Sequence, residues 1–227
     1  MGTIGALAHR GRAFLLLSCD GAPVGLVWQR LPALGRWLAA GLVDGDRGVY
    51  AGVNEAGVWV AAVGNLELGE AVRRAAAEVL TAAASLAEAV SFAERLMVDN
   101  LASGCLGLAE GGQVALVEVV HHEPRTEVTG TGFFARSSPE PDEAAEDSAP
   151  LGEIRCERLT AFLEQLYAWL PALDEEDVAA RCWAVLRQEP ILNPRTRASL
   201  FADVLDRRVD LAIEDGPWQS LRLGTGD

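Results

Sequence analysis

The chain contains no lysine: all 19 of its basic residues are arginine, against 33 aspartate and glutamate residues, which gives a formal net charge of -14. This excess of acid opposes non-specific attraction to nucleic acid and to anionic membrane surfaces. We therefore expect neither nucleic acid nor a membrane as the partner. The oligomeric state stays open, with a homo-oligomer among the alternatives.

The sequence also lacks paired cysteines, long apolar runs and a glycine-rich phosphate loop that opens a helix. No apolar stretch approaches the length that spans a bilayer. Without a C-x-x-C pair, neither a zinc ribbon nor a thioredoxin-type motif is supported, so we expect a reduced, cytoplasmic protein with no metal and no cofactor. The four cysteines are widely spaced: Cys19, Cys105, Cys156 and Cys182.

Short β-like runs dominate the first third of the chain, separated by glycine, aspartate, asparagine and proline. The tetrapeptide Asn54-Glu55-Ala56-Gly57 is typical of a hairpin turn, with Asn54 and Gly57 suited to positive φ. The predicted strands are residues 3–8, 13–18, 24–29, 48–53 and 58–63.

Helical spacing of alanine, leucine and charged residues follows, and Ser85 with Glu88 makes a capping box. Residues 137–151 carry acidic residues and prolines and are predicted to be a solvated loop; an alternative is that this loop docks a basic partner. The predicted helices are 69–84, 85–99, 152–169 and, after the acidic cap 174–177, 178–187. The later predicted strands are 105–109, 113–120, 127–136, 196–205 and 209–214.

This order does not alternate strand by strand. It favours an α+β fold with antiparallel sheets and segregated helices over a doubly wound parallel sheet. We treat residues 1–227 as one domain. Periodicity alone does not fix how the sheets and helices are stacked.

The stretch GVNEAGVWVAAVGN, residues 52–65, resembles the amidases of the N-terminal nucleophile (Ntn) hydrolase superfamily. The similar families are the choloylglycine hydrolases, the penicillin V acylases and the acyl-coenzyme A:isopenicillin N acyltransferases. Asp20, Asn65 and Arg155, with Arg158 as the second member of an arginine pair, match this pattern in order and spacing. The resemblance implies a four-layer αββα sandwich with two antiparallel sheets between helical layers.

In these families a terminal cysteine attacks an amide carbonyl, and the acyl-enzyme passes to water or to another acceptor. The resemblance therefore implies an amidase or acyltransferase for a linear C–N amide of a small acylated amine, or for an acyl-coenzyme A. It places the nucleophile at residue 2, with Asp20 holding the α-amine, Asn65 in the oxyanion hole and Arg155 tuning charge. Four further residues are expected to contact substrate: Ser18, Trp59, Arg136 and Ser138.

The chain departs from the pattern because Gly2-Thr3 stands where Cys-Thr is expected. Leu17, Ser18 and Ser138 also differ from the residues usual at their places. Four explanations stay open. Gly2 replaces a cysteine in an enzyme; Thr3 is an alternative nucleophile after removal of the first two residues; the chain is a noncatalytic small-molecule-binding protein on the same scaffold; or a thiol such as Cys19 reacts instead.

Overall fold

The computed structural model describes residues 2–20, 26–31, 35–44, 48–64, 69–120, 123–138, 151–214 and 216–223. Within these ranges the chain forms two antiparallel β-sheets and four α-helices. The predicted α+β class and the predicted pair of antiparallel sheets are confirmed.

The first sheet has six strands in the order β10-β1-β2-β11-β12-β13. It brings the start of the chain together with its last third, because β1 pairs with β2 and β10, and β2 pairs with β11. The strands are β1 (Gly2–His9), β2 (Arg12–Asp20), β10 (Gly132–Ser137), β11 (Thr196–Asp203), β12 (Arg208–Ile213) and β13 (Gln219–Arg222).

The second sheet has seven strands, β3 to β9, that lie side by side in chain order. Each strand therefore pairs with the next one along the chain, through hairpins and through one helical excursion between β6 and β7. The strands are β3 (Leu26–Arg30), β4 (Ala39–Asp44), β5 (Val49–Asn54), β6 (Trp59–Gly64), β7 (Gly104–Glu110), β8 (Gln113–Val120) and β9 (Glu123–Thr129).

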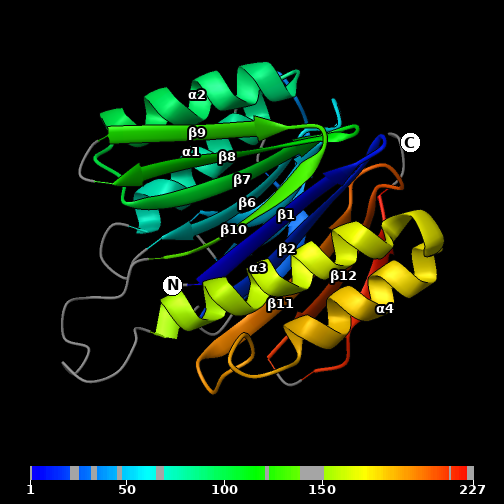
Figure 1. The fold of residues 1–227 in the computed structure, drawn as a ribbon. Coiled ribbons are helices and arrows are strands. Elements are labelled where there is room, and N and C mark those ends of the chain that lie inside the picture. Colours follow the sequence, from blue (N-terminus) through cyan, green and yellow to red (C-terminus); the bar gives the residue numbers. More distant parts are fainter. Residues whose placement is uncertain are drawn as a thin grey trace.

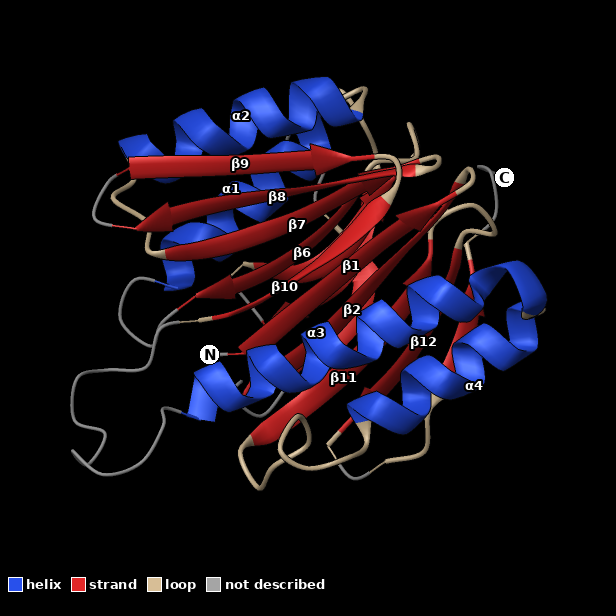
Figure 2. Cartoon of the chain, in the orientation of Figure 1, coloured by secondary structure: helices blue, strands red, loops and turns tan. Residues whose placement is uncertain are grey.

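The helices cover the outer faces of the two sheets (Figure 1, Figure 2). Helices α1 and α2 pack on the second sheet, and α3 and α4 pack on the first. The result is the predicted four-layer order of helix, sheet, sheet and helix. The helices are α1 (Gly69–Ala82), α2 (Leu86–Asp99), α3 (Leu151–Trp169) and α4 (Glu175–Leu186), with a short 3₁₀ turn, η2 (Leu170–Ala172), after α3.

Strand β1 shows how the sequence builds these layers. Its residues alternate between two faces, as the pleat requires. Ile4, Ala6 and Ala8 belong to the apolar core between the sheets, whereas Leu7 belongs to the core beneath α3 and α4. Both faces are thus buried, which explains why the strand reads as a nearly continuous apolar run.

Two helices begin at the capping residues that the sequence predicts. Ser85 Oγ accepts from Glu88 N at 3.3 Å, and the Glu88 carboxylate accepts from the backbone of Ala84 at 2.8 Å. Asp174 caps α4 by accepting from Asp177 N at 2.8 Å. The first turn of α4 therefore begins at Glu175, earlier than the predicted start at residue 178.

The hairpin between β5 and β6 is present, but only one of its two ends has the predicted backbone conformation. Gly57 has a φ of 90°, as predicted, whereas the prediction of positive φ for Asn54 is wrong, because Asn54 ends β5 in extended backbone. Asn54 contributes through its side chain, whose Nδ2 donates to the carbonyls of Leu80 and Ala83 at 2.9 and 2.8 Å. Its Oδ1 accepts from Val58 N at 2.9 Å, so Asn54 joins the hairpin to the end of α1.

The single strand predicted over residues 127–136 is wrong. The segment forms β9 and β10, which belong to different sheets and are joined by a turn at residues 130–131. Thr129 Oγ1 accepts from Thr131 N at 3.0 Å and closes this turn. Strands β4 and β13 were not predicted from the sequence.

The predicted acidic loop at 137–151 falls mostly outside the described residues: β10 ends at Ser137, and α3 begins at Leu151. Among the helices of the described ranges, none combines the length and the apolar character needed to cross a membrane.

Candidate functional site

Most of the predicted site residues meet where β1 begins and β2 ends. Thr3 lies opposite Ser18 on β2 and opposite Ser137 on β10. Figure 1 shows the start of β1 beside the first turns of α3, the helix that carries Arg155. The fold therefore brings together residues 2, 3, 18, 20, 138 and 155.

Gly2 is held by its backbone. Its N–H donates to Ser138 Oγ at 3.0 Å, and its carbonyl accepts from Ser138 N at 3.0 Å. A Cβ on Gly2 would lie 2.3 Å from the carbonyl oxygen of Ser18 and 3.0 Å from Cγ1 of Val63. A side chain at residue 2 would therefore point toward β6 in the second sheet, and it would require the backbone of β2 to move.

Thr3 faces the opposite side of β1, toward the helices, because successive strand residues alternate. Its hydroxyl is fully buried and lies 2.8 Å from Ser137 Oγ. Thr3 thus shares a face with Ser18, Asp20 and Arg155, whereas residue 2 does not.

Asp20 and Arg155 form a buried ion pair in which each side chain is only 4% exposed. Arg155 Nη1 donates to Asp20 Oδ2, and Arg155 Nη2 donates to Asp20 Oδ1 at 3.0 Å. This two-point geometry suits a guanidinium and a carboxylate. Arg155 Nε is buried and has no hydrogen-bond partner in the described part of the chain.

The segment before β11 completes the network around this pair. Arg155 Nη2 donates to the carbonyl of Ile191 at 2.7 Å, and Thr196 Oγ1 donates to Asp20 Oδ1 at 3.0 Å. Ser18 Oγ donates to the same Ile191 carbonyl at 3.2 Å and accepts from Arg155 Nη2 at 3.2 Å. Both oxygens of Asp20 therefore accept hydrogen bonds from side chains of this network.

Sequence reasoning did not identify Ile191 or Thr196. Ile191 takes part through its backbone carbonyl, which no side-chain pattern reveals. Thr196 only marks the start of a predicted strand, and threonine is common in strands for packing reasons. Both positions become recognisable only when β11 pairs with β2.

Two predicted site residues, Trp59 and Arg136, lie apart from this cluster. Trp59 is buried in the core between the sheets, at the opposite end of β6 from Val63, about 13 Å away by strand geometry. Arg136 pairs with Glu127 at 2.6 Å and Glu118 at 3.5 Å on the neighbouring edge of the second sheet. Asn65 lies outside the described residues.

The described ranges contain no group of three or more histidine, cysteine, aspartate or glutamate side chains placed to hold a metal ion. The chemistry available in the described cluster is therefore that of hydroxyls, one carboxylate and one guanidinium. Such a cluster can fix a backbone and donate or accept hydrogen bonds.

All four cysteines lie in the described ranges and are free thiols. Burial raises the pKa of the Cys19 thiol to about 12, and it also raises the pKa of Cys105 and Cys182. The pKa of Cys156 is raised by burial as well, but this residue is only partly buried.

We expect iodoacetamide at pH 8 to label Cys156 first and to leave the other three thiols almost unmodified in the folded protein. With a pKa of about 12, only about one Cys19 side chain in ten thousand is a thiolate at that pH, and the thiolate is the reactive form. Peptide mass spectrometry would follow each site, with the protein in guanidinium as the control in which all four react. If Cys19 were labelled as fast as Cys156, this prediction would be wrong, and Cys19 would again be a candidate for the reactive thiol.

No family model matches the sequence, and no curated protein matches it by sequence. Solved structures do match the fold. Penicillin V acylase from Agrobacterium tumefaciens is similar with a TM-score of 0.62 and 15% identity, over 96% of this chain and 85% of that one.

Two further structures give the same result. The Caenorhabditis elegans ortholog of N-acylethanolamine-hydrolyzing acid amidase has a TM-score of 0.61 and 13% identity, over 89% of this chain and 93% of that one. A variant of conjugated bile acid hydrolase from Clostridium perfringens has a TM-score of 0.59 and 10% identity, over 96% and 92%. These proteins belong to the Ntn-hydrolase superfamily, and the chain has their fold.

Proposed function

We propose that this chain binds a small acylated amine, or a related acyl-coenzyme A, at the start of β1 and does not cleave it through residue 2. The observation that carries the proposal is the packing of Gly2. This residue has no side chain to attack a carbonyl, and a Cβ there would lie 2.3 Å from the Ser18 carbonyl oxygen.

The kind of ligand is supported by the fold. The similar structures are described as an acylase, an acid amidase that hydrolyses N-acylethanolamines and a hydrolase of conjugated bile acids. A scaffold shared with such proteins is suited to a ligand with an acyl group joined to an amine. Because function depends on the site and not on the fold, this support reaches the ligand class and not the reaction.

The polar cluster supports a fixed binding site. The Asp20–Arg155 pair and the Ile191 carbonyl anchor the end of β2 and the segment before β11. Ser138 holds both backbone groups of Gly2. In this proposal Asp20 and Arg155 act as positioning residues, and Asn65 and Ser138 supply hydrogen bonds to the ligand.

A second candidate is an amidase or acyltransferase that uses Thr3 after removal of the first two residues. It is favoured by one observation: the Thr3 hydroxyl shares a face with Asp20 and Arg155 and lies 2.8 Å from Ser137 Oγ. In that case Thr3 attacks the acyl carbonyl, the amine leaves, and the acyl-enzyme passes to water or to another acceptor.

Three probes separate the two candidates: N-hexanoylethanolamine, N-hexanoylglycine and hexanoyl-coenzyme A. Binding is measured by calorimetry, turnover by release of amine or coenzyme A, and the terminus by mass spectrometry with an amine-reactive tag. Binding without turnover supports the binding protein, whereas turnover with a terminus at Thr3 supports the enzyme. If the chain neither binds nor converts any of the three, both candidates are rejected.

We expect Gly2→Cys to lower the free energy of unfolding by about 1–3 kcal/mol, as overpacking does, and to create no turnover. Gly130→Cys is a matched control, because the nearest atom to a Cβ at Gly130 is 3.9 Å away. Urea denaturation and the hydrolysis assay check the two parts. Turnover by Gly2→Cys at unchanged stability would show that Gly2 stands in place of a working cysteine.

A further inference from the structure

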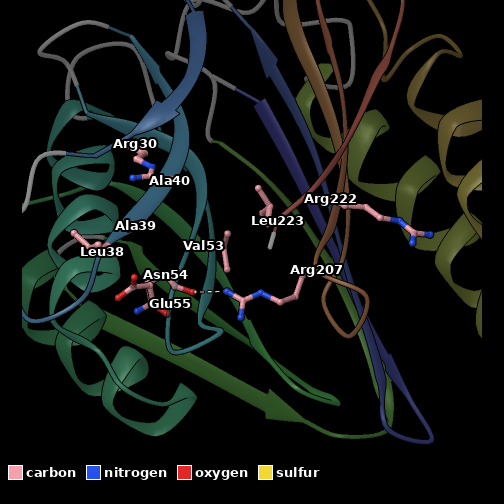
Figure 3. Close-up of a pocket in the computed structure, with 10 residues that line it drawn as sticks. All are labelled: Arg30, Leu38, Ala39, Ala40, Val53, Asn54, Glu55, Arg207, Arg222 and Leu223. Atoms are coloured by element: carbon pink, nitrogen blue, oxygen red, sulfur yellow. Dashed lines mark hydrogen bonds between the residues drawn. The ribbon is translucent and has the colours of Figure 1, made fainter. Parts of the chain in front are cut away.

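A cleft of about 470 Å³ lies between the two sheets, at the end of the sandwich opposite residue 2. The turn between β11 and β12 borders this cleft. That turn lies beside the β1–β2 turn, where Val204 N donates to the carbonyl of Ala13 at 3.0 Å. Figure 3 shows strands β3 to β5 on one side of this cleft and the β11–β12 turn with the end of β13 on the other. Its volume falls in the range of small-molecule sites.

Arg207 reaches across the cleft. Its Nη2 donates to the backbone carbonyl of Asn54 at 3.1 Å, as the dashed line in Figure 3 marks. Its own carbonyl accepts from Leu223 N at 2.9 Å, and its φ is 49°, which is unusual for a residue other than glycine. The bond to Asn54 uses one of the five N–H donors of the guanidinium, so others are available to a ligand.

Arg30 lies on the opposite wall, at the exposed end of edge strand β3. Neither Arg30 nor Arg207 forms an ion pair with another described residue. Glu55 is the acidic residue among the described residues that line the cleft, and the side chain of Arg222 leads away from it in Figure 3. Among the described lining residues, arginines therefore outnumber acidic side chains, in a chain whose net charge is -14.

The floor between the two arginines is apolar. Val53 comes from β5 in the second sheet, Leu38 from the segment just before β4, and Leu223 from the segment after β13. Val53 belongs to the apolar core between the sheets and Leu223 packs against that core, and Figure 3 shows both side chains at the gap. The Asn54 backbone at this wall is fixed in position, because the Asn54 side chain is hydrogen-bonded to the end of α1.

We propose that this cleft binds a small organic carboxylate with an apolar body. The carboxylate lies between Arg207 and Arg30, since a guanidinium matches a carboxylate with paired N–H donors. The apolar part lies against Leu38, Val53 and Leu223. This site is separate from the start of β1, so it stands or falls independently of the acyl-amide proposal.

Titration calorimetry with octanoate, octanamide and inorganic phosphate tests the site on the full chain. We expect octanoate to bind at least about tenfold more tightly than octanamide, which lacks the charge, and than phosphate, which lacks the apolar body. Arg30→Gln and Arg207→Gly should each weaken octanoate binding by about tenfold. Arg207→Gly also relieves the left-handed backbone, so it should stay folded with an unfolding midpoint near that of the parent chain.

Arg74→Gln is the matched control, because Arg74 is an exposed arginine on α1 that pairs with Glu70; it should leave octanoate binding unchanged. N-hexanoylethanolamine binding should not respond to Arg207→Gly, which separates this cleft from the site at residue 2. The proposal is overturned if octanoate fails to bind at millimolar concentration, if phosphate or octanamide binds equally well, or if Arg74→Gln weakens binding as much as Arg207→Gly does.

Discussion

Replacing Arg155 with alanine is expected to lower the free energy of unfolding by about 3–5 kcal/mol, the cost of breaking a buried ion pair by removing one of its members. Asp20 is 4% exposed, and without Arg155 its carboxylate would lose both guanidinium hydrogen bonds while keeping the one from Thr196 Oγ1. The Ile191 carbonyl would also lose its 2.7 Å bond. Urea denaturation monitored by tryptophan fluorescence measures the change.

Arg158→Ala is the matched control for this prediction. Arg158 lies one helical turn further along α3, is exposed, and donates to Gln188 Oε1 at 3.0 Å. We expect its replacement to change stability by no more than about 0.5 kcal/mol. Equal effects of the two substitutions would mean that the buried pair contributes no more to stability than a surface residue.

A double variant separates charge from packing. Asp20→Leu combined with Arg155→Met removes both charges and keeps apolar volume, and such replacements of buried pairs are often neutral or stabilising. We therefore expect the double variant to be more stable than Arg155→Ala alone. A double variant that is less stable than Arg155→Ala would show that the hydrogen bonds to Ile191 and Thr196 matter more than the ion pair.

Asn54→Asp is expected to destabilise the protein by about 3 kcal/mol, although the two side chains have nearly the same shape. The substitution removes both Nδ2 donors and places carboxylate oxygens against the carbonyls of Leu80 and Ala83. Asn54 is 1% exposed, so no water replaces the lost donors, and each unsatisfied buried group costs about 1–3 kcal/mol. Thermal and urea denaturation measure the loss.

Asn100→Asp provides the comparison for Asn54. Asn100 also donates from Nδ2 to a helix-end carbonyl, that of Leu96 at 2.7 Å, but it is exposed. Water can solvate its lost partner, so we expect a cost below about 1 kcal/mol. Hydrogen exchange at the end of α1 should accelerate in Asn54→Asp and stay unchanged in Asn100→Asp. The same cost at both positions would contradict the tertiary role given to Asn54.

The sequence predicted the structure correctly where the conformation depends on residues that are close together in the chain. Capping residues such as Ser85 and Asp174 begin helices because a side-chain oxygen meets a backbone N–H three residues away. Gly57 takes the left-handed conformation because it lacks a Cβ. Segment 127–136 was misassigned because its two halves are both β-like, and only pairing with different sheets separates them.

The site was predictable in part for the same reason. The resemblance named Asp20 and Arg155, but their pairing across 135 residues, and the bonds from Ile191 and Thr196, exist only after β11 docks on β2 and α3 packs above them. Residue 2 is a glycine in the sequence. That β2 leaves no room for a side chain there is a property of the packed sheet.

The sequence by itself determined most of the strand and helix segments, which of their faces are apolar, and that residue 2 carries no nucleophile. These follow from short-range periodicity and from the chemistry of single residues. The tertiary structure decided which polar groups are buried together and where the cleft between Arg30 and Arg207 opens. Both features depend on contacts between segments far apart in the chain, and no local sequence pattern indicates such contacts.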